Sequence, residues 1–324
     1  MIKPRRPHFE ESIKNIIDVK VFAMSNKDRF EFGENWARFL STLDDKRIDV
    51  AKQSLQALIQ VNEFKQLRFL DAGSGSGLFS LAASQLGADV TSFDLDQNSV
   101  ACTRQLKERF CPDSISWNVL EGSLADRNFL NSLGRFDVVY CWGVIHHTGE
   151  MWNCLENLLP LVKPGGRIVL AIYNDESYIS GIWQGIKRTY QKIPKMTRPI
   201  FVAVVGAVLF FKRLIVTIMA SCLRLFMLKN PFVPFLNWAN ETKSRGMNGW
   251  HDLVDWVGGW PFEVAKPEAV FRFMRDRDFV MQDFSTSGGH GCNEFVFVRE
   301  RPVDVSHQAV EEQVSLIRPE IQGR

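Results

Sequence analysis

The segment LDAGSGSGLF, residues 70–79, follows an apolar run and contains glycine at positions 73, 75 and 77. A glycine-rich turn after a strand can cradle a phosphate or a dinucleotide, or let the backbone approach another ligand closely. A phosphate-binding loop requires a lysine after its glycines, and none follows here. The dinucleotide fingerprint GxGxxG, read from Gly73, would need glycine where Leu78 stands. The spacing therefore disfavours both of these ligand classes.

Strand-like and helical segments alternate after this loop. Strand-like runs are expected at residues 67–73, 88–96, 114–124 and 166–175, and at the start of 136–147. Helical runs are expected at residues 78–87, 97–110 and 151–162. Alternation of this kind predicts a parallel sheet with helices on both faces.

The alternation stops near Asp175 and returns with a helical run at 266–279. Strand-like runs follow at 280–287 and 292–300, and the short stretch between them predicts an antiparallel pair. We therefore expect four parts: an N-terminal arm with helices (1–64), a core (65–300), a helical insertion within that core (175–265) and a flexible tail (301–324).

Asp71 lies two residues before the first glycine, so the loop reads D-x-G-x-G-x-G. This pattern resembles motif I of the class I methyltransferases that use S-adenosylmethionine (SAM). The order of elements over residues 65–173 and 266–300 is also similar to that superfamily, and most similar to the ubiquinone-biosynthesis O-methyltransferases. The resemblance implies an α/β fold with a Rossmann-like sheet, parallel except for one antiparallel closing strand.

The resemblance also implies where SAM would bind. Glycines let the loop approach the methionine part of the cofactor, and Asp71 can accept a hydrogen bond from its ammonium group. Asp94, at the end of the second strand, can accept from both ribose hydroxyls. The expected cofactor-binding residues are Asp71, Gly73, Ser74, Gly75, Gly77, Asp94, Leu95, Gly122, Ser123, Leu124, Cys141 and Trp142.

Methyl transfer to a hydroxyl needs in-line alignment and a group that takes the proton. Histidine suits the second task because its pKa is near neutrality. We expect His146, ahead of His147 and His290, to be the catalytic base, although the similar enzymes carry Glu-His where this chain has His146-His147. Asn174 and His251 are expected to contact the acceptor. No group of residues at metal-ligand spacing is found, so we expect no metal site.

Phe32 and Trp36 lie four residues apart, on one face of an expected helix. They could close over the cofactor, although plain packing explains the same spacing.

The chain has 324 residues, of which 45% are hydrophobic and 23% charged, and a formal net charge of +2. Six cysteines without a CxxC pair predict neither a disulfide framework nor a zinc site, and favour a cytoplasmic location. The first residues do not have the pattern of a signal peptide.

Charge is unevenly distributed, because no acidic residue occurs between Glu176 and Glu241. That interval contains nine cations: Lys187, Arg188, Lys192, Lys195, Arg198, Lys212, Arg213, Arg224 and Lys229. The apolar run at 200–211 is interrupted by Lys212 and Arg213, which disfavours a membrane-spanning helix, since each central charge costs roughly 2.5–3.5 kcal/mol.

Two interpretations of the insertion remain open. Its helices could cover an apolar acceptor pocket as a lid, or lie in a membrane interface with their cations on anionic lipid. The two are compatible. Nucleic acid is a weaker prediction because the cations alternate with aliphatic rather than stacking residues.

Together these patterns predict a SAM-dependent methyltransferase that O-methylates a small apolar or lipid-like acceptor, in the cytoplasm and peripheral to a membrane. The alternatives are an RNA or protein methyltransferase that uses the basic insertion, and a SAM-binding regulatory protein without turnover.

Overall fold

The computed structural model describes residues 43–61, 63–112, 116–244, 249–287 and 291–301. Residues 1–42 of the expected N-terminal part, with Phe32 and Trp36, lie outside the described residues, as do His290 and residues 302–324 of the expected tail. The strands are β1 (Arg68–Ala72), β2 (Asp89–Asp94), β3 (Trp117–Glu121), β4 (Phe136–Trp142), β5 (Val162–Tyr173), β6 (Phe279–Ser285) and β7 (Cys292–Arg299). The helices are α3 (Asp45–Ile59), α4 (Leu78–Gln85), α5 (Gln97–Phe110), α6 (Arg127–Ser132), α7 (Met151–Leu158), α8 (Tyr178–Lys192), α9 (Arg198–Phe226), α10 (Val233–Ser244), α11 (Gly249–Gly258) and α12 (Pro267–Arg275).

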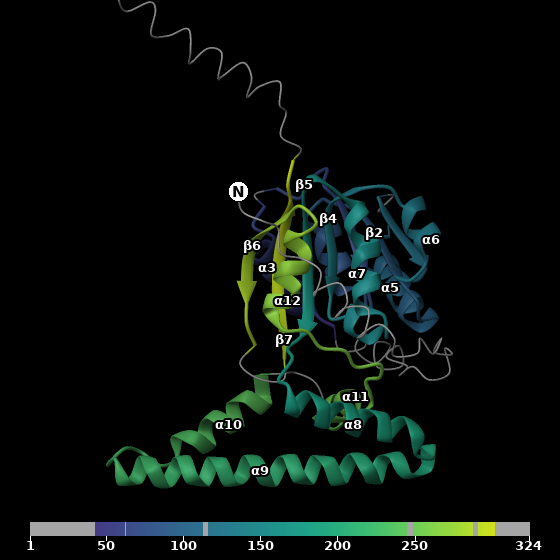
Figure 1. Ribbon diagram of the computed structural model, residues 1–324. Helices are drawn as coiled ribbons and strands as arrows, with labels where there is room; N and C mark the ends of the chain where they lie inside the picture. Colours follow the sequence, from purple (N-terminus) through teal and green to yellow (C-terminus); the bar gives the residue numbers. More distant parts are fainter. Residues whose placement is uncertain (1–42, 62, 113–115, 245–248, 288–290, 302–324) are drawn as a thin grey trace, which may run out of the picture.

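The strands form one seven-stranded sheet in the order β3-β2-β1-β4-β5-β7-β6 (Figure 1). The pairs among β1 to β5 are parallel, whereas β7 runs antiparallel to both β5 and β6. This is the predicted α/β, Rossmann-like sheet with its antiparallel closing strand. Successive strands are added on one side of β1 up to β3 and on its other side from β4 onward, and a ligand-binding crevice opens at such a switch point in folds of this kind.

Helices cover both faces of the sheet because its central strands are apolar on both sides. One buried cluster joins the sheet to α7 and α12, with Phe136, Leu155 and Met274 among its members. The other joins it to α3 and α4, and includes Leu55 and Leu81.

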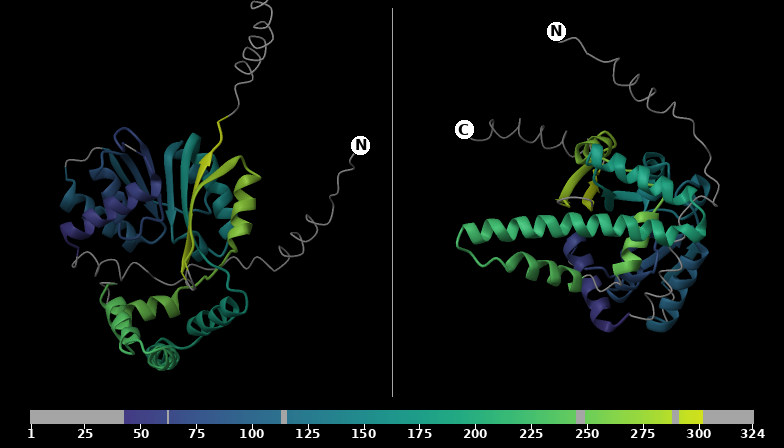
Figure 2. Two further views of the ribbon diagram at one scale, coloured as in Figure 1. Left: turned by 90° about the vertical axis from the view of Figure 1, so that its left-hand side faces the viewer. Right: turned by 90° about the horizontal axis from the view of Figure 1, so that it is seen from below.

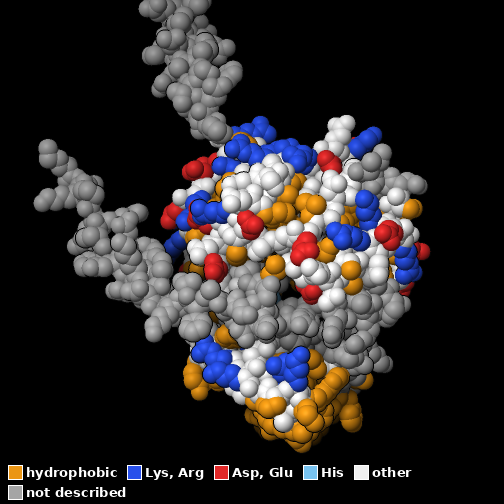
Figure 3. Space-filling model, turned by 90° about the vertical axis from the view of Figure 1, so that its right-hand side faces the viewer, with side chains coloured by type: hydrophobic (Ala, Val, Ile, Leu, Met, Phe, Trp, Pro, Cys, Tyr) orange, Lys and Arg blue, Asp and Glu red, His pale blue; other side chains and the backbone are white. Residues whose placement is uncertain are grey.

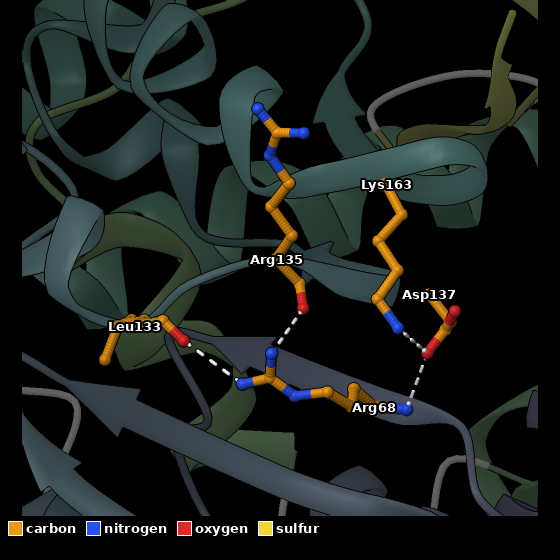
Figure 4. Close-up of polar contacts among 5 residues, drawn as sticks. All are labelled: Arg68, Leu133, Arg135, Asp137 and Lys163. Atoms are coloured by element: carbon orange, nitrogen blue, oxygen red, sulfur yellow. Dashed lines mark hydrogen bonds and ion pairs between the residues drawn. The ribbon is translucent and has the colours of Figure 1, made fainter. Parts of the chain in front are cut away.

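Polar contacts hold the amino ends of β1 and β4 together, at the edge opposite the crevice (Figure 4). The Arg68 backbone N–H and Lys163 Nζ both donate to Asp137 Oδ2, at 2.9 and 2.8 Å. The Arg68 guanidinium donates to the carbonyls of Arg135 and Leu133, at 2.7 and 3.2 Å. These contacts fix the strand that leads into the glycine loop.

Several element boundaries differ from the sequence expectation. β5 begins at Val162 rather than at residue 166, because Val162 already pairs with Phe136 of β4, and regular pairing resumes at Arg167 after an irregularity that contains KPGG. α7 ends at Leu158, and a short 3-10 turn that contains Pro160 follows instead of a third α-helical turn.

The insertion lies beyond the carboxyl end of β5. α8 and α11 lie nearest the sheet, and α9 crosses the molecule as its outermost element (Figures 1 and 2). A third apolar cluster, which includes Trp183, Tyr190, Val202, Val257 and Phe262, packs these helices together. The insertion therefore covers the edge of the sheet where the crevice opens.

Candidate active site

A cavity of about 530 Å³ opens at the carboxyl ends of β1, β2 and β3. Ligand sites are typically of this size and position in open α/β sheets. Half of the expected cofactor residues line it: Gly73, Asp94, Leu95, Gly122, Ser123 and Leu124. They come from three different loops, which the parallel sheet brings to one edge.

The glycine loop has a backbone that other residues would not adopt readily. Gly73, Gly75 and Gly77 have φ angles of +84°, +54° and +80°. A Cβ atom on Gly73 would lie 2.4 Å from Val144 Cγ1, and one on Gly77 would lie 2.8 Å from Thr103. Glycine is therefore required at 73 and 77 both by the turn and by close packing.

Asp94 links this loop to the end of β2. Its Oδ2 accepts from the backbone N–H of Gly75 and its Oδ1 from that of Asp96, both at 2.9 Å. The N–H groups of Gly73 and Ser74 donate to the Phe93 carbonyl. Burial raises the pKa of the Asp94 carboxyl. The carboxylate is thus held in place on the cavity wall, where it can accept hydrogen bonds from a ligand.

Asp71 lies behind the loop rather than on the cavity lining. It is buried, and Ser80 Oγ donates to its Oδ2 at 2.5 Å. Burial raises the pKa of Asp71 to about 7, with the nearby charge of Asp94 acting in the same direction. The structure therefore shows a carboxyl that supports the loop from within; contact with the cofactor ammonium stays a prediction.

The two adjacent histidines have different surroundings. His147 lines the cavity, whereas His146 is buried against Tyr173, with ring centroids 4.0 Å apart. Among the described residues, His146 Nδ1 has no hydrogen-bond partner. This placement reverses the order expected from sequence, because the histidine that faces the cavity is His147.

His147 is held in a defined tautomer. Its Nδ1 lies 2.7 Å from the Pro261 carbonyl, which can only accept, so Nδ1 carries the proton. Nε2 then has the lone pair that can accept a proton. Burial, followed by the charge of Lys187, lowers the pKa of His147 to about 4, so the ring is neutral near pH 7.

Lys187 of α8 is a buried cation behind the histidines. Its Nζ donates to the Trp256 carbonyl and lies 4.7 and 4.9 Å from the ring centroids of Trp256 and Phe262. Burial lowers the pKa of Lys187 to about 7. This contact joins α8 to α11 directly beside His147.

Cys141, Trp142 and Asn174 do not line the cavity. Cys141 is fully buried in the core, and the indole N–H of Trp142 donates to Glu294 at 2.8 Å. Asn174 Oδ1 accepts from Asn293 at 3.0 Å, and so joins the end of β5 to β7. His251 is on α11, and its side chain lies outside the described set, as does His290.

Sequence reasoning missed three kinds of lining residue. Glu121 is the last residue of β3 and directly precedes Gly122. Its position at the end of a strand was the one feature of the sequence that could have predicted it. Val144 is paired with Gly73 only by packing across the sheet. Trp260 comes from the end of the insertion, more than 100 residues away, and no local pattern places it there.

A second cavity, of about 390 Å³, lies between the start of α7 and the start of α8. Met151, Ser180 and Phe262 contribute to its lining. Glu263 lies on its wall, where its two carboxylate oxygens accept from the Met151 N–H at 3.1 Å. The segment that contains His147 and Met151 separates the two cavities.

Comparison with known proteins agrees with this geometry. The family model described as "Methyltransferase domain" matches residues 70–168. A ubiquinone biosynthesis O-methyltransferase of Rickettsia conorii is 31% identical over 124 residues, which is 37% of this chain and 40% of that protein. One from Pseudomonas aeruginosa is 29% identical over 134 residues, or 40% and 55% of the two chains. The chain thus spans about half the length of these relatives or less.

A solved structure, PKMT2 from Rickettsia typhi in complex with AdoHcy, has the same fold with a TM-score of 0.51. The two chains are 11% identical, and the match covers 78% of this chain and 54% of PKMT2. Residues 70–168, which the family model matches, contain the glycine loop, Asp94 and both histidines. Residues 70–168 thus match a methyltransferase domain, and the sheet that contains them has the same fold as PKMT2.

Proposed function

We propose that this protein transfers the SAM methyl group to an oxygen atom of a small, apolar, lipid-like acceptor. The position of His147 carries the proposal, since this neutral histidine lines the cofactor cavity beside Gly73 and Trp260. Oxygen as the acceptor atom is supported by the relatives named ubiquinone biosynthesis O-methyltransferase. An apolar acceptor is supported by the aromatic insertion that covers this edge of the sheet.

The residues of the cavity fit SAM. The backbone of the loop leaves no room for a side chain at Gly73, as close approach to a ligand requires. Asp94 would hold the ribose hydroxyls, and Leu95 and Leu124 would flank the adenine. When bound, SAM supplies an electrophilic methyl group at this edge of the sheet.

His147 would act as the base. Its Nε2 would accept the proton of the acceptor hydroxyl as the new carbon–oxygen bond forms and the carbon–sulfur bond breaks. The Pro261 carbonyl holds the other ring nitrogen and so orients the ring. Because burial lowers the pKa of His147, the proton would then pass readily to solvent.

We infer a location in the cytoplasm, at the surface of an anionic membrane, since a lipid-soluble acceptor is concentrated there. The basic, acid-free stretch between Glu176 and Glu241 supports this location.

The experiment uses SAM labelled in its methyl group, incubated with the full chain and a total membrane lipid extract. Transfer RNA and casein are offered in parallel. We expect the label to enter the organic phase, and His147→Gln to abolish this transfer. Label in RNA or protein would support the alternative acceptors and contradict the proposal. SAM binding without any labelled product would instead indicate a non-catalytic protein.

A further inference from the structure

The outermost helix, α9, has an apolar surface that the protein itself leaves uncovered. It contains 29 residues, and it is the one helix among the described residues that is long and apolar enough to cross a membrane. Only 11% of its most apolar window is buried. An exposed apolar surface of this extent marks an interaction site on a soluble protein.

Ten exposed apolar residues of α9 share one side, while others, such as Phe210, Val216 and Leu223, are exposed outside it. With 3.6 residues per turn, ten residues fall within an arc of about 100° that faces away from the protein. We call them the outer stripe: Ile200, Val204, Ala207, Val208, Phe211, Ile215, Ile218, Cys222, Leu225 and Phe226. All ten are exposed and none is charged.

The cations of α9 lie off this stripe. Lys212 lies on its flank, exposed, and Arg213 points the other way, 5.2 Å from the ring centroid of Trp238 on α10. Arg198 lies 4.9 Å from the ring centroid of Tyr190 on α8. In Figure 3 the hydrophobic side chains form the lower end of the molecule, and Lys and Arg lie directly above them. An interfacial helix has this arrangement.

The opposite side of α9 is covered by the protein. Val202 is buried and packs with Val257 of α11 in the third apolar cluster. At Gly206 the two helices are so close that a Cβ atom would lie 2.5 Å from Leu253. A spanning orientation would carry α11 and the paired core into the bilayer and place Lys212 and Arg213 near its centre. A helix that lies flat avoids both costs.

We propose that α9 lies in the plane of an anionic lipid bilayer surface, with the outer stripe in the acyl boundary. The occupant follows from charge complementarity, since residues 177–240 contain no carboxylate to repel anionic headgroups. Lys192, Lys195, Lys212 and Lys229 are exposed along this part of the chain. The inference deepens the proposed function and rests on it, because docking here sets the active-site edge of the sheet above the bilayer that would hold the acceptor.

The first test is flotation of the full chain with vesicles of phosphatidylcholine containing about a third phosphatidylglycerol, and with phosphatidylcholine alone. Val208→Glu/Ile215→Glu adds two charges to the outer stripe. Val50→Glu/Val280→Glu adds the same charges at similarly exposed positions on α3 and β6. We expect wild type and the control to float with the anionic vesicles, and the stripe variant to partition at least about tenfold less.

Failure of wild type to float, or equal flotation of both variants, would overturn the proposal. A dimer of wild type in solution that the stripe variant dissociates, without vesicle binding, would assign the stripe to a second copy instead. SAM binding by all three proteins is measured without lipid, so loss of docking is distinguished from loss of the proposed enzymatic function.

A depth measurement separates a flat helix from a spanning one. A fluorophore is attached to Cys222, Phe211→Cys or Ile200→Cys, one at a time, with the other accessible cysteines changed to serine. From 200 to 222 the helix rises about 33 Å, the full hydrocarbon thickness of a bilayer. A flat helix gives the same quenching depth at all three positions. A deep centre between shallow ends would contradict the proposal.

Discussion

At the scale of single residues, the adjacent side chains of His146 and His147 have different surroundings. His146 packs on Tyr173 in the interior, while His147 reaches the cavity with its Nδ1 bound to the Pro261 carbonyl. Their order in the sequence could not show this, because a short 3-10 turn sets which ring faces outward. The proposal therefore assigns the role of base to His147, the histidine that lines the cavity.

Replacing His147 tests this choice. We expect His147→Gln to lower kcat by at least about 100-fold, since a positioned base contributes 10²–10⁴-fold, with SAM affinity within a few-fold of wild type. His146→Phe keeps a ring against Tyr173 and should retain most activity. Steady-state kinetics and calorimetry measure both. An inactive His146→Phe that folds, beside an active His147→Gln, would reverse the assignment.

Asp71 makes stability depend on pH in the direction opposite to most carboxyls. Its pKa is about 7 in the folded chain, against an ordinary 3.8, because burial penalises the charged form. Between these values the folded chain keeps a proton that the unfolded chain has lost, so the free energy of unfolding falls as pH rises towards and through 7.

Asp71→Asn should remove this dependence, because its amide oxygen can still accept from Ser80. Urea unfolding at pH 5 and pH 8 tests it. We expect the variant to gain stability relative to wild type by a few kcal/mol at pH 8, and less at pH 5. Exposed Asp126→Asn is the control. A difference between variant and wild type that does not change with pH would rule out a buried, protonated Asp71.

At the scale of elements, the strands of the sheet could be predicted from the sequence, but the contacts among the loops at their carboxyl ends could not. The alternation of apolar strand-like runs with helical runs indicated each strand from β1 to β7, because a parallel sheet covered by helices requires apolar strands. The pairing of Gly73 with Val144, and of Trp260 with the cavity, depends on contacts between distant segments. Cys141 and Trp142, which the resemblance implies as cofactor-binding residues, do not line the cavity.

Gly73 of the glycine loop has a matched control in Gly143, which follows β4. Gly73 and Gly143 both have positive φ, at +84° and +76°, but nothing lies within 4 Å of a Cβ atom on Gly143. Gly143→Ala should cost about 1–3 kcal/mol from strain alone. Gly73→Ala should cost more, since a stiff valine must also move.

SAM binding should respond in the same way. Gly73→Ala should weaken it and Gly143→Ala should change it little, while Gly73→Ala/Val144→Ala should recover part of the loss. Thermal unfolding and calorimetry on the four proteins would show this. Equal effects of the two single substitutions would mean that close packing at Gly73 is unimportant.

At the scale of the whole molecule, the insertion covers one edge of the sheet. The sequence suggested two apolar runs broken by Lys212 and Arg213, yet α9 is continuous. Lys and Arg are good helix formers and so do not break it, and helical geometry turns both side chains off the outer stripe. With α8 and α11 between it and the sheet, α9 lies beneath the edge where cofactor and acceptor would meet (Figures 1 and 2).

The central claim, that this edge of the sheet holds SAM through Asp94, is tested most directly by calorimetry. We predict that wild type and Asp126→Asn bind one SAM per chain. Asp94→Asn should bind it about 10- to 100-fold more weakly, because charge-assisted hydrogen bonds to the ribose are lost. No binding by wild type, or equal binding by Asp94→Asn, would contradict the account.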